Sequence, residues 1–199
     1  NIFKVRLSDQ VVVAEASITS TGTIDDCVAD GSGGVYFATS EGVFHRDASF
    51  NALSNIGCNV RAEALAIDDE DNLYVVGEEC LVSLDNGCDV EWSVRKYSSS
   101  GTLLDGHNFQ SPSAVAWRAD FLYVGFRDID VASPCNVVKL DMEDWSCVWT
   151  FRVGESNGES PTLRPDIVRD LAVSDAGVYA ASNQYLFQLS DADGKKNGC

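Results

Sequence analysis

The chain has 199 residues, a hydrophobic content of 45% and a formal net charge of −17 at pH 7. This excess of acidic residues argues against nucleic acid or an anionic membrane surface as a partner, because like charges repel one another. No apolar run approaches the roughly 18 residues of a membrane span, and no charged-then-apolar signal segment opens the sequence, which begins with Asn rather than Met. We therefore interpret it as a mature or excised chain without a membrane span.

The first predicted elements are two short strands at 3–7 and 11–17, followed by four copies of one pattern. Each copy has a small apolar strand, then a second strand with a tyrosine near its middle, then a third apolar strand. The tyrosines are Tyr36, Tyr74, Tyr123 and Tyr179. Residues 73–76 are apolar on both faces, as expected for a strand in a sheet that is packed between two other sheets.

The copy at 63–85 shows the pattern most clearly, with predicted strands at 64–67, 73–77 and 81–84. A fourth strand is predicted in two copies, at 92–97 and 147–153. Successive tyrosines are separated by roughly 40–55 residues, close to the length of a four-stranded propeller blade. No helix is predicted at any point of the sequence.

We therefore predict an all-β chain, a β-propeller of four-stranded antiparallel blades with about four to five blades visible. Residues 1–23 supply the third and fourth strands of an incomplete blade; 24–62, 63–112 and 113–165 are blades; 166–190 is an incomplete blade; 191–199 is a linker or the start of a Cys-rich region. Both ends carry a third strand and so duplicate each other. We expect part of a larger or partner-completed propeller, since an open arc leaves sheet faces exposed; a compact ring is the alternative.

The copies have the form apolar-Ala-apolar-Asp, then Gly/Asn-apolar-Tyr-apolar, then apolar-x-Leu-Asp. In this respect residues 24–190 resemble the NHL/SMP-30-like class of β-propellers. The resemblance implies the fold. The class ranges from lactonases and lyases to inert scaffolds and protein-binding discs, so the fold alone implies no single function.

Seven cysteines without a C-x-x-C pair indicate disulfides and an oxidising compartment. The predicted bridges, each within one blade, are Cys80–Cys88, Cys135–Cys147 and Cys27–Cys58. The first two would staple the outer hairpins of two blades at equivalent places. Cys27 is alternatively a small core residue of an inner strand. Cys199 is left over, which indicates an intermolecular bond or a partner cysteine outside the sequence.

The first strand of each propeller blade lines the central channel, so its leading residue faces a shared axial site. Those leading residues are Asp26, Glu63, Ser113 and Asp170. Three carboxylates, from Asp26, Glu63 and Asp170, would form a hard-oxygen site suited to calcium, and the resemblance supports this interpretation. The alternative is a solvated channel mouth.

Two other acidic segments have ordinary interpretations beside a functional one. Residues 68–71 are predicted to be an exposed turn. The tail from Asp191 begins with D-x-D-G, as calcium loops do, but lacks the carboxylate that completes such a loop; it is otherwise a linker.

No catalytic residue is predicted. The two histidines, His45 and His107, lack the spacing of a zinc site, and no G-x-S-x-G elbow is present. The four tryptophans either stack on sugars or fill the core; they are Trp92, Trp117, Trp145 and Trp149.

The sequence favours a secreted, extracellular, disulfide-stapled β-propeller that serves as a structural or protein-interaction unit of a larger assembly, and it favours a non-enzymatic role over an enzymatic one. Its expected partners are other protein chains or further domains of the same chain, and glycans are a further candidate. The alternative is a calcium-dependent hydrolase or lyase of the SMP-30/NHL kind that uses the channel carboxylates. A carbohydrate-binding propeller is the third interpretation.

Overall fold

The computed structural model describes residues 2–6, 8–16, 22–56, 60–82, 88–127, 136–151, 167–183 and 185–195. Within these ranges every regular element is a β-strand, and all paired strands run antiparallel. The described part of the chain therefore has no helix that could span a membrane. The predicted all-β class is confirmed.

Four sheets follow one another in chain order, and each is a meander of neighbouring strands. Blade 1 contains β3 (Ile24–Ala29), β4 (Val35–Thr39), β5 (Gly42–Arg46) and β6 (Ala52–Ile56). Blade 2 contains β7 (Val60–Ile67), β8 (Leu73–Val82), β9 (Cys88–Tyr97) and β10 (Leu103–Asn108). Blade 3 contains β11 (Pro112–Arg118), β12 (Phe121–Phe126), β13 (Val137–Asp141) and β14 (Cys147–Phe151). Blade 4 contains β15 (Val168–Ser174), β16 (Gly177–Ser182) and β17 (Leu186–Leu189).

A separate hairpin of β1 (Ile2–Arg6) and β2 (Val11–Ala16) precedes blade 1. It is attached to blade 1 through Lys4, whose Nζ donates hydrogen bonds to the carbonyl oxygens of Gly33 (3.1 Å) and Ala48 (3.2 Å). Several of its apolar side chains, including Phe3 and Val12, are exposed.

The prediction for blade 2 was wrong in one respect. The segment 81–84, predicted as a separate third strand, begins at the end of the ten-residue strand β8, and the predicted fourth strand 92–97 belongs to the third strand, β9. The true fourth strand is β10, which has only exposed residues. Its lack of a buried face explains why the sequence pattern did not indicate it.

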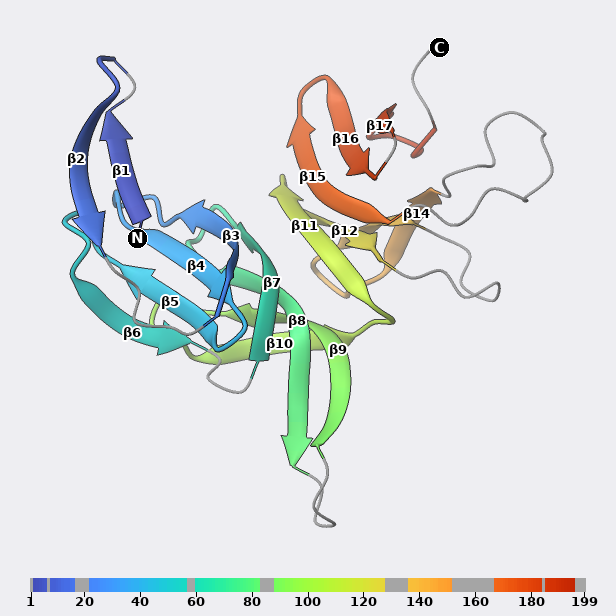
Figure 1. Ribbon diagram of the computed structural model, residues 1–199. Coiled ribbons are helices and arrows are strands. Elements are labelled where there is room, and N and C mark those ends of the chain that lie inside the picture. Colours follow the sequence, from blue (N-terminus) through green and yellow to red (C-terminus); the bar gives the residue numbers. More distant parts are fainter. Residues whose placement is uncertain are drawn as a thin grey trace.

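The blades form an arc with their first strands on its inner side (Figure 1). Contacts between blades run in chain order, from β3 to β7, from β7 to β11 and from β11 to β15. Blades 1 and 4 stand apart at the two ends of the arc (Figure 1). The molecule is thus a four-bladed propeller arrangement whose ends are not packed face to face.

Three hydrophobic clusters form the core, and each lies between two successive blades. Tyr36, Tyr74 and Tyr123 are 1%, 0% and 0% exposed, and each packs on the side of its blade that faces the next blade. The opposite face of each second strand packs towards the preceding blade, as Val75 and Val124 do. A strand covered on both faces needs apolar residues at every position, which is the pattern seen in the sequence.

A basic residue of the third strand accompanies each of these tyrosines, and an aspartate accompanies the basic residue. The sets are Tyr36–His45–Asp30, Tyr74–Lys96–Asp68 and Tyr123–Lys139–Asp191. The distances from basic nitrogen to carboxylate oxygen are 2.8, 3.2 and 2.6 Å. We call them the tyrosine–base–aspartate sets.

The aspartate has two different origins in these sets. In blades 1 and 2 it follows the first strand and caps the next turn; Asp68 Oδ1, for example, accepts a hydrogen bond from the backbone N–H of Asn72 (2.8 Å). In blade 3 the corresponding turn is shorter, and Asp191, from the segment after blade 4, takes that place. The Asp of the recurring sequence pattern is thus a buried structural residue, which corrects the prediction of an exposed turn for Asp68 but not for its neighbours Asp69 to Asp71.

Candidate functional site

Each of the four inner strands has a β-bulge near its start, where one extra residue interrupts the pairing with the second strand. The bulged residues are Asp25, Glu63, Ser113 and Arg169. Bulges re-aim side chains and recur next to functional sites. Here they place four polar side chains at equivalent positions on the inner side of the arc.

The bulges also correct the predicted alignment of the axial residues. Glu63 and Ser113 are bulged residues, whereas Asp26 and Asp170 each follow the bulge by one position. The true equivalents of Glu63 are Asp25 and Arg169. A single sequence does not reveal the extra residue, because the alternation of apolar and polar residues is too short there to fix the register.

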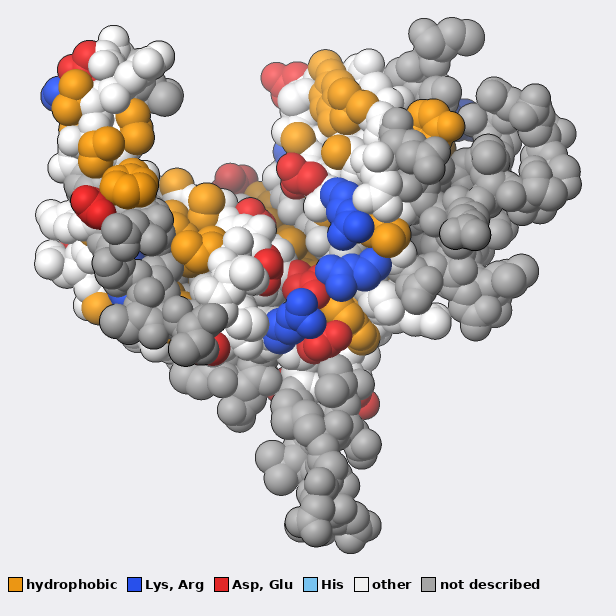
Figure 2. Space-filling model, viewed as in Figure 1, with side chains coloured by type: hydrophobic (Ala, Val, Ile, Leu, Met, Phe, Trp, Pro, Cys, Tyr) orange, Lys and Arg blue, Asp and Glu red, His pale blue; other side chains and the backbone are white. Residues whose placement is uncertain are grey.

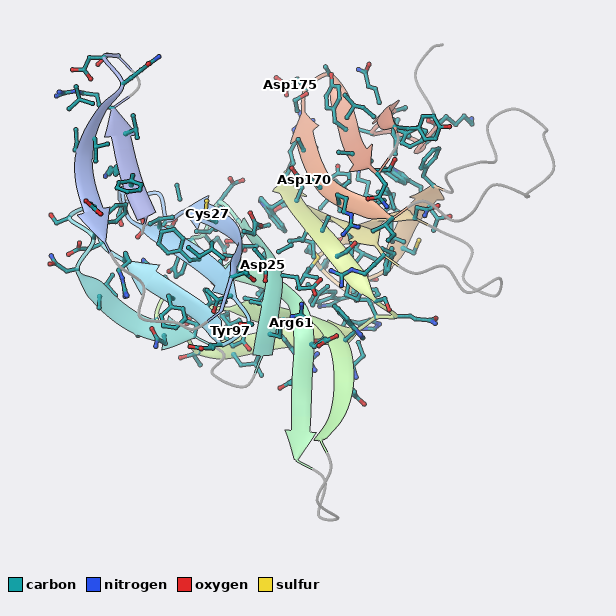
Figure 3. The ribbon with its side chains drawn as sticks, in the orientation of Figure 1. Asp25, Cys27, Arg61, Tyr97, Asp170 and Asp175 are labelled. Atoms are coloured by element: carbon teal, nitrogen blue, oxygen red, sulfur yellow. The ribbon has the colours of Figure 1, made fainter. Side chains whose placement is uncertain are left out.

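Two adjoining cavities, of about 170 and 190 Å³, lie at this centre and share four of their lining residues, the bulged ones. All four predicted axial residues line one or both of them. Three arginines that the sequence analysis did not single out are also present, and they are Arg61, Arg127 and Arg169. Figure 2 shows basic side chains beside acidic ones on the inner side of the arc. In Figure 3, Asp25, Arg61 and Asp170 lie along this side, on β3, β7 and β15.

Glu63 is the most enclosed ionisable group of the centre, with 8% of its surface exposed. Its Oε2 accepts a hydrogen bond from Arg127, while its buried Oε1 has no hydrogen-bond partner among the described residues and lies 3.8 Å from Arg61. Burial raises the pKa of Glu63, although the charges of Arg127 and Arg61 oppose this effect. Arg127 also lies over the ring of Trp92, 5.5 Å from its centroid.

Polar bonds at the centre join successive blades. Asp26 Oδ2 accepts a hydrogen bond from the backbone N–H of Leu65 in blade 2 (2.8 Å), and Ser113 Oγ donates one to the carbonyl oxygen of Val168 in blade 4 (2.7 Å). Burial raises the pKa of Asp26, against the hydrogen bonds from Leu65 and Cys27 and with a smaller contribution from the charge of Asp170. Two of the predicted calcium ligands, Asp26 and Glu63, are thus already bound to protein donors.

No three His, Cys, Asp or Glu side chains in the described ranges are grouped closely enough to hold a metal ion. The calcium site on Asp26, Glu63 and Asp170 remains a prediction, and its geometry receives no support from this arrangement. The alternative interpretation, a solvated channel mouth, agrees with the open cavities.

The D-x-D-G tail packs onto blade 3 as far as it is described. Asp191 accepts hydrogen bonds from Lys139 Nζ (2.6 Å) and Tyr123 Oη, and its carbonyl oxygen accepts one from Trp149 Nε1 (2.9 Å). Burial disfavours the charge of Asp191, but the bonds from Lys139 and Tyr123 outweigh it and hold its pKa below the ordinary value. The first carboxylate of this motif therefore stabilises the third tyrosine–base–aspartate set.

The predicted disulfides fall largely outside the described side chains. Cys27 and Cys147 are exposed and form no disulfide with another described cysteine, and partial burial of the sulfur raises the pKa of both. Their predicted partners, Cys58 and Cys135, and the unpaired Cys199 lie outside the described residues. In the β8–β9 hairpin the backbone of Cys88 lies opposite Val82, two residues from Cys80. The three pairings remain predictions.

The aromatic and histidine residues have structural partners. His45 Nε2 donates to Asp30 at 2.8 Å and the His45 ring stacks on Tyr36, while His107 stacks on Trp145. Trp149 is buried and the other three tryptophans are partly buried. None of the four is laid out as a fully exposed platform for a sugar.

A second candidate surface is the face of blade 4 that points away from blade 3. The register places Tyr179 at the position of Tyr123, Leu186 at that of Val137 and Gln188 at that of Lys139. Val137 is 0% exposed and Leu186 is 71% exposed. We call this surface, formed by Asp170, Ala172, Tyr179, Leu186 and Gln188, the uncovered face of blade 4.

No protein-family model matches the sequence, and no curated protein matches it. Solved structures do match. A gluconolactonase, XC5397 from Xanthomonas campestris, has a TM-score of 0.61 at 14% identity, over 87% of this chain and 60% of its own. The extracellular domain of BT4673 from B. thetaiotaomicron has a TM-score of 0.58 at 14% identity, over 91% of this chain and 22% of its own. BamB from Moraxella catarrhalis has a TM-score of 0.55 at 15% identity, over 92% of this chain and 58% of its own.

At these identities the matches show the fold alone, and the fold is the β-propeller. The predicted resemblance is thus confirmed at the level of the propeller class. The narrower NHL/SMP-30-like class is not distinguished, because a gluconolactonase and BamB match this chain almost equally well. The chain also spans less than two thirds of each of these three proteins.

Proposed function

We propose that the chain is a non-enzymatic, extracellular β-propeller module that acts as a structural or protein-interaction unit of a larger assembly. The observation that carries the proposal is the uncovered face of blade 4. This face repeats the positions that blades 1 to 3 use to bind the next blade, yet its side chains are exposed or partly exposed.

The three covered interfaces define what the uncovered face would bind. At each of them a tyrosine is covered by apolar residues of the following blade. At the first interface, Asp26 accepts a hydrogen bond from the backbone N–H of Leu65, across the boundary between blades 1 and 2. Asp170 occupies the register position of Asp26, and its Oδ1 accepts the N–H of Leu171 just as Asp26 Oδ1 accepts that of Cys27. The partner that fits is therefore another blade, with a backbone N–H for Asp170 and apolar side chains for Tyr179 and Leu186.

The free-energy gain from covering this face is substantial. Burial of a leucine side chain contributes about 1.5–3 kcal/mol, and Leu186 is still mostly exposed. Large uncovered apolar surfaces on soluble proteins mark sites of association. A further blade from the same chain and one from another chain would make the same contacts.

The extracellular location and the disulfides are supported less directly. Seven cysteines in a chain of this size favour an oxidising compartment. Matching structures include the extracellular domain of BT4673 and PorZ, a bacterial surface component of a secretion system, the latter with a TM-score of 0.54 at 12% identity. Both are longer chains of which this one covers about a fifth, 22% and 20%.

Hydroxyl-radical footprinting read by mass spectrometry tests the proposal. Oxidation of Leu186 and Tyr179 is measured in the isolated chain and in the protein as purified in its native state. Leu104, on the outer strand β10, is similarly exposed and serves as the matched control. We expect Leu186 and Tyr179 to be protected in the native protein while Leu104 is labelled equally in both. Equal labelling of Leu186 in both samples would overturn the proposal.

A further inference from the structure

The two central cavities differ in the charges of the side chains that line them. The first is lined by three arginines against two carboxylates, those of Asp25 and Glu63. The second is lined by one arginine, Arg169, against four carboxylates, those of Asp25, Asp26, Glu63 and Asp170. One end of the joined space is therefore net positive and the other net negative. The chain has a formal charge of −17, with 14 basic residues against 31 acidic ones. Three arginines around one cavity are therefore not expected from the composition alone.

At the boundary between the two ends, a buried acceptor is left without a donor. Glu63 Oε1 is inaccessible to solvent and has no hydrogen-bond partner in the described part of the chain, and Glu63 lines both cavities. A buried polar atom without a partner costs about 1–3 kcal/mol, and more when it is charged. A ligand that donates a hydrogen bond to this oxygen would recover that free energy.

Beside this acceptor lies the guanidinium of Arg61, whose contacts with neighbouring carboxylates are long. The side chain of Arg61 is 50% exposed, and its nearest carboxylate oxygens, on Glu63 and Glu78, are both 3.8 Å away. Those distances are too long for hydrogen bonds. A guanidinium binds a carboxylate through two parallel hydrogen bonds. Arg61 can therefore take a ligand carboxylate without giving up a strong bond to any residue that the structure describes.

We infer that the centre binds a small zwitterion of the α-amino-acid class. Its carboxylate lies at the positive end, on Arg61 and Arg169. Its ammonium lies at the negative end beside Asp25, where a rotation of the Glu63 carboxylate brings the enclosed Oε1 within reach of its N–H groups. A simple anion would meet four carboxylates in this space, and a simple cation would meet three guanidiniums, so only a ligand with both charges matches both ends.

The dimensions and the lining restrict the side chain of the ligand. Cavities of about 170 and 190 Å³ hold a small molecule rather than a peptide. The apolar part of the lining consists of small side chains from Ala64, Ala114, Val115 and Val168. The ligand therefore has a short side chain, as glycine, alanine and serine do. The residues assigned to the ligand, Arg61, Arg169, Glu63 and Asp25, do not belong to the uncovered face of blade 4, although Asp170 of that face lines the second cavity.

Isothermal titration calorimetry on the whole chain tests the inference. The twenty amino acids are titrated singly, with acetate as the carboxylate alone and methylammonium as the ammonium alone. We expect a short amino acid such as glycine to bind at least about tenfold more tightly than either half, since one charge-assisted hydrogen bond is equivalent to roughly that factor.

Two substitutions and a control locate the binding. Arg61→Gln, at a half-exposed site, and Glu63→Gln, which preserves shape, should each weaken binding by about tenfold or more. Arg6→Gln is the matched control, because Arg6 is a similarly exposed, ion-paired arginine of the distant hairpin β1–β2. If Glu63→Gln impairs folding through Arg127, Arg61→Gln alone decides. Failure of every amino acid to bind better than acetate and methylammonium would mean a water-filled channel and overturn the inference. Unchanged binding by Arg61→Gln would mean that the ligand lies elsewhere, and it would overturn the inference as well. Leu186→Asn should leave this binding unchanged, which separates the result from that of the assembly proposal.

Discussion

Blade 3 and blade 4 present the same face, at the same register positions, to two different surroundings. On blade 3, Tyr123 and Val137 are fully buried because blade 4 covers them. On blade 4, the equivalent Tyr179 is partly exposed and Leu186 is 71% exposed. The difference shows that each blade carries half of an interface in its own sequence. Whether that half is buried depends only on the presence of a neighbour.

The two faces also differ in one polar position. Lys139 of blade 3 lies over Tyr123 and is bound by Asp191, whereas the equivalent residue of blade 4 is Gln188, whose amide donates to Tyr179 Oη at 3.2 Å. A neutral side chain needs no counter-ion when it is buried. At this position blade 4 can therefore be covered by a partner without a lysine being left unpaired.

The largest expected effect contrasts two tyrosines of this pattern. Tyr74→Ala removes a fully buried ring from the interface of blades 2 and 3 and should lower the free energy of unfolding by about 3–5 kcal/mol. Tyr179→Ala, on the uncovered face, should lower it by about 1 kcal/mol or less. Urea denaturation of the two variants measures both values. Equal losses would mean that blade 4 is covered within this chain, contrary to the comparison.

The second prediction concerns the aspartates in the tyrosine–base–aspartate sets of blades 1 and 2. Burial disfavours the charges of Asp30 and Asp68, but their hydrogen bonds, from His45 and Asn72 among others, outweigh it and keep the pKa of each below 3.8. A carboxyl with a lowered pKa in the folded state stabilises the fold at neutral pH, and this stability is lost as the pH falls from the unfolded value through the folded one. The chain should therefore lose stability as the pH falls below about 4.

Asp68→Asn measures this contribution at one covered interface. At pH 7 it leaves Lys96 without its counter-ion and should cost about 1–3 kcal/mol. The difference from the unmodified chain should shrink as the pH falls below the pKa of Asp68, where the native carboxyl is also neutral. Asp69→Asn, one residue along in the exposed part of the turn, is the control and should have no measurable effect. Chemical denaturation at several pH values gives the comparison; a pH-independent difference would contradict it.

Much of this arrangement was predictable from the sequence. The four tyrosines and the apolar residues around them predicted the second strands and the propeller, since a strand covered on both faces has an unmistakable composition. The predicted axial residues do lie at one centre. These successes depend on repetition, because four copies of a weak pattern reinforce one another.

The unpredicted features depend on contacts between segments that are distant in the sequence. Arg127, which follows β12, binds Glu63 of β7 across a blade boundary. Asp191 replaces an aspartate that a shortened turn of blade 3 lacks. The bulges that align Glu63 with Arg169 leave no trace in the composition of the strands. The repeat predicted the strands and the propeller. The contacts of Arg127 and Asp191 and the positions of the bulges differ from one copy to another, and no pattern in the sequence indicated them.

The third prediction tests how closely blades 3 and 4 approach. A Cβ atom on Gly125 would lie 2.5 Å from Val168 Cγ1 and 3.2 Å from the Cβ of Ala114. Gly125→Ala should therefore separate the two blades and lower the free energy of unfolding by about 1–2 kcal/mol, the usual cost of overpacking. Ala181 occupies the same register position on the uncovered face, and Ala181→Val should change stability by about 0.5 kcal/mol or less. Thermal or urea unfolding checks both, and tolerance of Gly125→Ala would show that the boundary is loose.

The smallest expected effect is at Leu186, and it bears most directly on the assembly. Leu186→Asn removes an apolar side chain that is largely exposed in this chain, so the free energy of unfolding should change by about 0.5 kcal/mol or less. Val137→Asn, at the equivalent covered position, should cost at least about 2 kcal/mol, because a polar side chain would enter the buried, apolar boundary of blades 3 and 4. Urea denaturation of the isolated chain gives both values. If Leu186→Asn proves as costly as Val137→Asn, Leu186 is packed by the chain itself, and the uncovered face no longer argues for a partner. The other outcome is that Leu186→Asn leaves the isolated chain unchanged and destabilises the protein purified in its native state. In that case the blade that covers Leu186 is present only in the native protein.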